Sequence, residues 1–144
     1  MTNSPFLHKL FHGEPAGRFA LGHVFHFQQG FSTLEMSLAS PDSGRWSCDL
    51  DDSDSLTWSD KIYELFGIPN GSAVERAEAV ARYSDRSKSV LERIRNFAIG
   101  HKCGFILDAT ISSDGGKDRW IRVIAFPVLN GEKVVGLQGL KRAL

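Results

Sequence analysis

The sequence of 144 residues lacks several features that would assign it to a common class of protein. It contains only two cysteines, Cys48 and Cys103, which do not form a CxxC motif. This scarcity argues against a disulfide framework and a structural zinc site, and it fits a reducing cytoplasm. No apolar run approaches the length of a membrane span, and the N-terminus lacks the pattern of a signal peptide. We therefore expect a cytoplasmic protein that does not bind a membrane.

The chain also lacks an excess of charge of either sign. Its 17 basic residues balance 17 acidic residues, and the basic residues do not gather into a run. Nucleic-acid-binding domains usually carry a basic patch that neutralises phosphates. We therefore expect no nucleic-acid partner.

Residues 1–40 differ in pattern from the rest of the chain. Their apolar residues recur with helical spacing at Ala20, Val24, Phe27, Phe31, Leu34 and Leu38. Such a stripe predicts a long helix, which the turn sequence "SPDSG" would end. We interpret residues 1–40 as a helical extension that caps a sheet of its own domain. The alternative interpretation is a helix shared between two chains.

Short strands and helices are predicted from Arg45 onward. The segments "RWSCDL" and "LTW" predict a hairpin around an aspartate-rich turn. A short helix is predicted from Ser59 to Gly67, where Ser59 would accept a hydrogen bond from the first turn and Gly67 would close the last. A helical run over "AVERAEAVARY" and the main core helix, from Asp85 to a stop at Gly100, complete this part.

Three further strands are predicted in the last part of the chain, "GFILDATIS", "RWIRVIAFPV" and "KVVGLQGLK". Runs of strands on either side of several helices favour an α+β fold. We expect a five-stranded antiparallel sheet with short helices on one face. Alternation along the first two of these strands turns an apolar set toward the helices: Phe105, Leu107, Ala109, Ile111, Ile121, Val123 and Ala125.

Several motifs occur in a characteristic order between Gly44 and Leu140: "W-x-x-D-L", "W-S-D-x-x-Y-x-L-F-G-I", "Y-S-D-R-S", "D-G-G-x-x-R-W-I-R-V" and "V-V-G-L-Q-G". This part of the chain resembles a PAS domain of bacterial signalling proteins, in the PAC-containing subgroup called the PAS-3 fold. The resemblance implies a PAS domain over residues 41–144. It also implies a sensory or interaction module in signal transduction.

A PAS fold implies a cavity between the sheet and its helices. Ala109 and Ala125 are small, which leaves room for an apolar or partly polar metabolite. In the alternative, the cavity is collapsed and the domain acts without a ligand, by dimerising or by docking on a partner. The expected lining residues are Trp46, Ile62, Phe66, Tyr83, Ile94, Phe97, Phe105, Leu107, Ala109, Val123 and Ala125.

Haem, flavin and metal ions are not expected. Light-oxygen-voltage members of the family use a cysteine in a motif similar to "G-x-N-C-R-F-L-Q", which is absent. Haem-binding members use a histidine in the long helix, and the sequence has none between Asp85 and Ile99. His8 with His12, and His23 with His26, would each share a helical face. No further ligand accompanies either pair, so we predict no metal site.

We expect no enzymatic activity. The inward residues of the two strands offer no general acid or base, since Asp108 and Arg122 face away from the helices. A small enzyme built around the cavity is the least favoured interpretation. The family resemblance instead implies a signalling partner, such as a histidine kinase or a diguanylate cyclase, in the same chain or a separate one.

The C-terminus leaves the relation to that partner open. PAS domains coupled to a downstream effector typically end in "D-I-T", whereas Arg142 and Ala143 stand near that position here. The expectation is either a stand-alone PAS adaptor or a domain cut from a longer sensor.

Both faces of "RWIRVIAFPV" are apolar, because Trp120, Ile124 and Phe126 alternate with the inward residues. An apolar outer face of this extent is usually covered. We expect the N-terminal helix to cover it, on its own sheet or on a second copy, and to form a homodimer through Val24, Phe27, Phe31, Leu34 and Leu38. All three tryptophans, Trp46, Trp58 and Trp120, are expected to lie against the domain.

Overall fold

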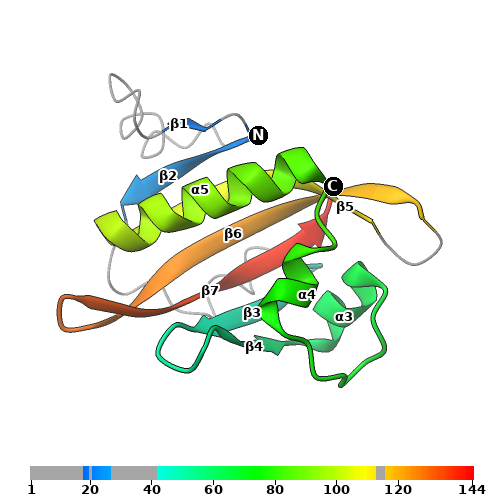
Figure 1. Cartoon of the computed structure of the whole chain (residues 1–144), viewed down its shortest axis with the longest axis horizontal. Helices are drawn as coiled ribbons and strands as arrows, with labels where there is room; N and C mark the ends of the chain where they lie inside the picture. The colour runs from blue at the N-terminus through cyan, green and yellow to red at the C-terminus, as the bar shows by residue number, and fades with distance from the viewer. Residues whose placement is uncertain (1–17, 20, 27–41, 113–115) are drawn as a thin grey trace.

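The computed structural model describes residues 18–19, 21–26, 42–112 and 116–144. Its centre is an antiparallel sheet of seven strands in the order β1-β2-β5-β6-β7-β3-β4. The described helices, α3, α4 and α5, cover one face of this sheet (Figure 1). This is the expected α+β architecture, with β1 and β2 added to the five predicted strands. None of the described helices combines the length and the hydropathy that a membrane span requires.

The five predicted strands all form. The hairpin predicted around "DDSDS" places Trp46 opposite Trp58. A turn at Asn130 and Gly131 joins the last two predicted strands into a hairpin, and Gly131 has a φ of 64°. The strands are β1 Arg18–Phe19, β2 Gly22–His26, β3 Gly44–Asp49, β4 Ser55–Trp58, β5 Cys103–Ser112, β6 Asp118–Asn130 and β7 Lys133–Ala143.

Helix α3 spans Asp60–Phe66, and Gly67 closes it in the left-handed conformation with a φ of 69°. The predicted cap is wrong, because the first turn makes no hydrogen bond to the Ser59 side chain. The Ser59 hydroxyl instead accepts a hydrogen bond from the Arg45 N–H at 2.9 Å, which ties the start of α3 to β3. Helix α4, predicted over 73–83, is confined to Arg76–Val80.

Helix α5 spans Asp85–His101 and lies across the sheet (Figure 1). Ser84 caps its start by accepting a hydrogen bond from the Ser87 N–H. The predicted stop at Gly100 is wrong, because the helix continues to His101 and Lys102 takes the left-handed conformation with a φ of 55°. The long helix therefore does contain one histidine, in its last turn. A glycine alone does not end a helix whose other face packs on a core.

Gly100 therefore lies inside an exposed helical turn. A Cβ atom there would meet nothing within 4 Å, so Gly100→Ala should raise the free energy of unfolding by about 0.5–1 kcal/mol through helix propensity. Urea denaturation measures this change. Gly67→Ala is the matched control, and it should destabilise by about 1–2 kcal/mol because Gly67 is left-handed. If both variants lost the same free energy of unfolding, the helical assignment of Gly100 would be contradicted.

The prediction of a helix through Ala20 and Val24 is wrong where the structure describes this segment, because Gly22–His26 forms β2. This strand pairs with the edge of β5, with Val24 opposite Phe105. A short run of apolar residues fits a strand as well as a helix, and the unpaired backbone groups of β5 favour the strand. Ala20 and the remaining members of the predicted stripe lie outside the described residues: Phe27, Phe31, Leu34 and Leu38.

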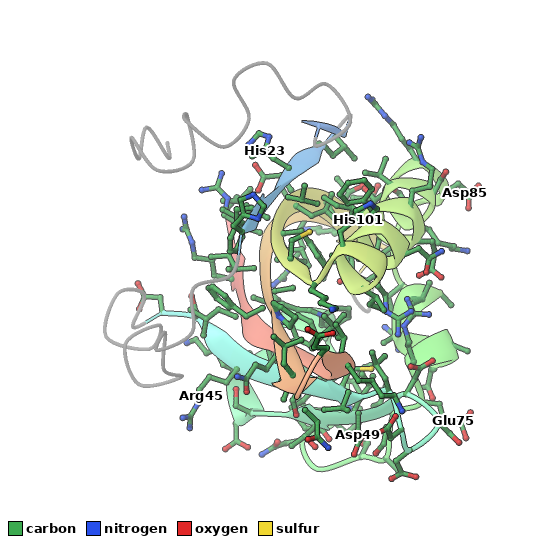
Figure 2. The ribbon with its side chains drawn as sticks, turned by 90° about the vertical axis from the view of Figure 1, so that its left-hand side faces the viewer. His23, Arg45, Asp49, Glu75, Asp85 and His101 are labelled. Carbon is green, nitrogen blue, oxygen red and sulfur yellow. The ribbon has the colours of Figure 1, made fainter. Side chains whose placement is uncertain are left out.

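His23 and His26 do not share a helical face as expected. His23 and His26 are both exposed in β2, where residues three apart point to opposite faces, and Figure 2 shows His23 at this edge of the sheet. His8 and His12 lie outside the described residues.

The outer face of the sheet is partly covered by the described residues themselves. Phe126 is 7% exposed and packs edge-to-face against Phe25, with ring centroids 5.4 Å apart. Ile124 is half-buried, and Asp108 pairs with Arg122 across β5 and β6 at 2.8 Å.

The tryptophans differ in their environments. Trp46 and Trp58 are buried, as predicted, with 8% and 9% of their surface exposed. Trp120 is 51% exposed, so the prediction that it lies against the domain is wrong. Trp120 lies near the start of β6, where Asp118 and Arg119 are exposed as well.

Candidate functional site

A small cavity lies between the inner face of the sheet and the segment that contains α4, Tyr83 and α5. Its volume is about 50 Å³, which is room for about four water-sized spheres. The lining residues are Trp46, Cys48, Leu56, Arg76, Ala79, Val80, Tyr83, Leu91, Arg95, Phe105, Val123, Leu137 and Lys141.

The cavity lies closer to β3 and β7 than the sequence predicted. Of the predicted lining residues, Trp46, Tyr83, Phe105 and Val123 border it. Phe97 is only partly buried and stacks on His101, with ring centroids 3.9 Å apart. The remaining predicted residues are buried elsewhere in the core: Ile62, Phe66, Ile94, Leu107, Ala109 and Ala125. The small side chains Ala109 and Ala125 therefore do not create this cavity.

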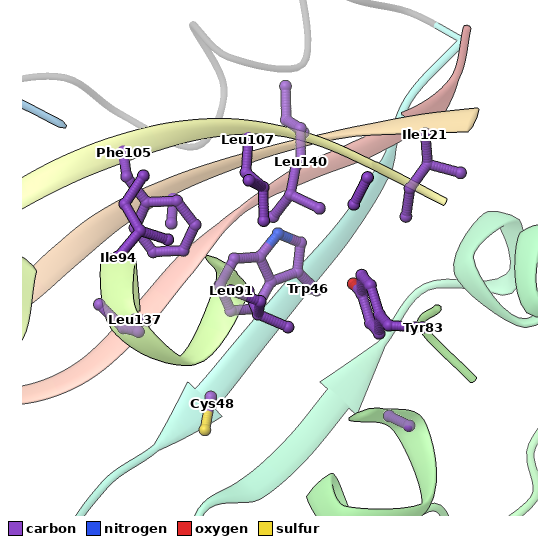
Figure 3. Packing of buried hydrophobic residues seen from close by; sticks show 14 of the residues in the cluster. Trp46, Cys48, Tyr83, Leu91, Ile94, Phe105, Leu107, Ile121, Leu137 and Leu140 are labelled. Carbon is purple, nitrogen blue, oxygen red and sulfur yellow. The ribbon is translucent and has the colours of Figure 1, made fainter. Parts of the chain in front are cut away.

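Aromatic side chains from several elements meet beside the cavity. Trp58 of β4 stacks on Phe66 of α3, with ring centroids 4.9 Å apart. Tyr83, just before α5, meets Phe66 edge-to-face at 5.9 Å. Figure 3 shows the Tyr83 hydroxyl directed toward Trp46 of β3. This aromatic cluster, Trp46, Trp58, Phe66 and Tyr83, joins residues far apart in the sequence.

Lys141 is the functional candidate that the sequence analysis missed. It lies on the helix-covered face of β7, opposite Val123 of β6 and Gly44 of β3, and is 9% exposed. None of the ion pairs within the described residues includes it. Its Nζ lies over the aromatic cluster, at 5.0 Å from the ring centroid of Trp46, 5.1 Å from Phe66 and 5.9 Å from both Trp58 and Tyr83.

The environment of Lys141 favours its neutral form. The pKa of Lys141 is lowered to about 7, mainly by burial and also by the Arg76 guanidinium, while Cys48 acts in the opposite direction. Ring faces attract an ammonium, but they replace only part of the lost hydration. Lys141 can therefore change its charge near neutral pH.

Three buried polar atoms of the aromatic cluster have no hydrogen-bond partner within the described part of the chain: Trp46 Nε1, Trp58 Nε1 and the Tyr83 hydroxyl oxygen. Buried polar groups are nearly always hydrogen-bonded, so atoms of this kind indicate a bound water or ligand. Burial raises the pKa of Tyr83 above its usual range, so its hydroxyl keeps its proton. Both Trp46 and Tyr83 border the cavity.

Two arginines also border the cavity, and each is paired with a carboxylate. Arg95 of α5 contacts Asp54 at 2.9 Å, and Arg76 of α4 pairs with Glu92. Both carboxylate side chains are 40% exposed. Cys48 lies near this group and keeps its proton, because burial raises the pKa of its thiol.

The other cysteine, Cys103, is buried at the start of β5, and both cysteines are free thiols. Burial raises the pKa of Cys103 to about 11. Within the described residues, no group of at least three His, Cys, Asp or Glu side chains could hold a metal ion.

No family model and no curated protein matches the chain, but solved structures do. The N-terminal domain of a diguanylate cyclase with PAS/PAC sensor from Marinobacter aquaeolei aligns with a TM-score of 0.64 and 16% identity, over 70% of this chain and 94% of that one. A sensory box histidine kinase/response regulator from Burkholderia thailandensis aligns with a TM-score of 0.61 and 11% identity, over 78% and 85%. An RNA-binding light-oxygen-voltage receptor aligns with a TM-score of 0.62 and 13% identity, over 71% of this chain but only 29% of its own length.

The chain therefore has the PAS fold, as the sequence motifs predicted. Two of these similar structures come from proteins named as a cyclase and a histidine kinase, which are signalling proteins. At these identities the likeness establishes the fold, and the chemistry of the site rests on the residues of this chain.

The size of the cavity leads to a spectroscopic prediction. Cofactor sites usually enclose about 300–1,000 Å³, whereas this cavity has about 50 Å³. A haem or a flavin therefore does not fit this cavity, and we expect neither a Soret band nor a flavin absorption doublet from a cofactor bound there. An absorption spectrum of freshly purified protein, recorded before and after denaturation, checks this. Either feature in the spectrum would overturn the prediction.

Proposed function

We propose that this chain is a PAS sensory module of a signal-transduction system, and that it senses a small ligand in the cavity beside Lys141. The observation that carries the proposal is the polar content of this cavity. Lys141 is buried without a carboxylate partner among the described residues, beside two polar atoms that lack hydrogen bonds. A cavity that served only packing would be expected to be apolar and empty.

A route from ligand to output follows from the position of Lys141. This residue lies close to the end of β7, which finishes at Ala143. A ligand that compensates the Lys141 charge would change the conformation of the end of β7. A partner protein that contacts this end would then respond to the ligand. We propose a histidine kinase or a diguanylate cyclase as the partner, in the same chain or a separate one.

A ligand-release experiment tests the sensory function. Protein purified under native conditions is denatured, and the released small molecules are identified by mass spectrometry. The wild-type protein should release a compound that the cavity-filling variant Ala79→Leu does not, since Ala79 is buried against the cavity. If a folded Ala79→Leu protein releases the same compounds in the same amounts, the cavity is not the ligand site.

A second function, dimerisation or docking through the outer face of the sheet, is favoured by an exposed apolar pair. Trp120 is 51% exposed and Leu144 is 55% exposed, and the Leu144 N–H donates a hydrogen bond to the Trp120 carbonyl at 3.0 Å. Large exposed side chains of this kind are typical of interfaces. We propose a homodimer that buries Trp120 together with the neighbouring outer face.

The variant Trp120→Ser tests the dimer. Light scattering should show a dimer for the wild-type protein and a monomer for Trp120→Ser, with unchanged circular dichroism. Lys133→Ser, at an exposed position of β7, serves as the control and should remain dimeric. A monomeric wild-type protein would exclude this function at the concentration used.

A further inference from the structure

We propose that the cavity is a binding site for a small monocarboxylate anion, held by the Lys141 ammonium group, the Trp46 indole N–H and the Tyr83 hydroxyl. This inference rests on the proposed sensory function and names the class of ligand. All three residues are at least nine-tenths buried and border the same cavity.

The hydrogen-bonding character of the lining favours an acceptor as the occupant. An indole N–H and an ammonium group can only donate, and the protonated Tyr83 hydroxyl can donate as well. The two arginines of the lining are also donors, and the lining contains no carboxylate or amide side chain. Water would fill the space, but among these side chains only the Tyr83 hydroxyl oxygen and the weakly accepting Cys48 sulfur could accept its protons. A carboxylate only accepts hydrogen bonds, so it satisfies these donors and brings no proton that needs an acceptor.

The charge of the lining favours an anion. Arg76 and Arg95 are each compensated by a carboxylate, Glu92 and Asp54. Lys141 has no such partner within the described residues, and a buried charge without compensation is costly. Cys48 does not supply the missing negative charge, because burial raises the pKa of its thiol.

Lys141 is also the residue that connects the cavity with the solvent. It borders a surface groove of about 320 Å³ on its other side. The charged residues of this groove are Asp42, Lys61, Glu64, Arg119 and Arg142, and none of them forms an ion pair with Lys141. A small anion that entered this groove would therefore meet Lys141, which lines both the groove and the cavity.

The size and the walls of the cavity select among anions. A volume of about 50 Å³ accommodates about four water-sized atoms, as in formate or acetate. Phosphate and sulfate are larger than acetate, and sulfate also carries more charge than one ammonium group compensates. Phe105, Val123 and Leu137 provide apolar walls for a short alkyl group.

Calorimetric titration tests the inference. The wild-type protein, dialysed into chloride buffer free of carboxylates, is titrated with formate, acetate, benzoate and phosphate. Formate or acetate should bind at pH 6, and benzoate and phosphate should not. Binding should weaken about 100-fold between pH 6 and pH 9, because the carboxylate stays ionised while Lys141 loses its proton.

Two variants locate the binding in the cavity. Lys141→Met should abolish binding, and Tyr83→Phe, which removes only a hydroxyl, should weaken it about 5- to 10-fold. Circular dichroism establishes that each variant is folded. If Lys141→Met does not fold, the effect of Tyr83→Phe and the pH dependence decide the result.

Three outcomes would overturn the inference: no heat of binding for either carboxylate, equal binding by wild type and Tyr83→Phe, or binding that does not depend on pH. Its failure can be distinguished from failure of the proposed function. If no carboxylate binds but the native protein releases another compound that Ala79→Leu lacks, the sensory function stands and only the ligand class is wrong.

Discussion

Replacing Trp46 by alanine is expected to lower the free energy of unfolding by about 3–5 kcal/mol. Trp46 is 8% exposed and is part of the cluster around Lys141. Its removal loses the burial of a large aromatic side chain and enlarges an existing cavity. The melting temperature should fall by roughly 10–15 °C, measured by circular dichroism.

The matched control is Trp120→Ala. Trp120 lies in a strand of the same sheet but is 51% exposed. This substitution should change the free energy of unfolding of the monomer by less than about 1 kcal/mol. Equal effects of the two substitutions would contradict the difference in burial between the two side chains.

The second large effect is a pH dependence of stability that Lys141 causes. In the unfolded chain Lys141 keeps its proton up to a pKa of 10.5, whereas in the folded protein burial lowers this pKa to about 7. Between these values the unfolded state binds more protons, so the free energy of unfolding rises with pH. The rise is at most about 1.4 kcal/mol per pH unit. Below pH 7 both states are protonated, and the contribution of Lys141 is constant.

Urea denaturation of the wild-type protein and Lys141→Met, in buffer free of carboxylates, measures this effect. Lys141→Met should be more stable than the wild type at pH 6–7, because it buries no charge. The difference should shrink as the pH rises toward 10. The raised thiol and hydroxyl pKa values of Cys103 and Tyr83 are present in both proteins, so they largely cancel in the comparison.

Lys133→Met is the control for this measurement, since the Lys133 side chain lies on the same strand but is 70% exposed. Its stability curve should run parallel to that of the wild type. If the curve of Lys141→Met also runs parallel to the wild type, the folded-state pKa of Lys141 is not lowered.

The sequence alone determined those helices and strands that are specified by residues close together in the chain. The α3 helix is specified by its apolar side and by Gly67, and the start of α5 by Ser84. The strands β3 to β7 follow from alternation and turn residues, since both act between neighbours in the chain. For the same reason the PAS motifs are recognisable in the amino-acid sequence by itself.

Only the tertiary structure decided the pairing of β2, because the open edge of β5 supplies its hydrogen bonds. It also decided which way Lys141 points. The β6–β7 hairpin pairs Leu129 with Val134 but Val128 with Gly136, so the register shifts there by one residue. Without this shift, alternation from the turn would place Leu140 opposite Val123, facing the helices, and Lys141 outside.

The shift reverses these positions, so that Lys141 lies opposite Val123 and Leu140 opposite Ile124. A bulge moves every later side chain of a strand to the other face. The bulge depends on how β7 fits between β6 and β3. Alternation within one strand carries no information about this fit. A buried lysine surrounded by rings from β3, β4, α3 and the start of α5 is therefore a product of the assembled sheet and its helices.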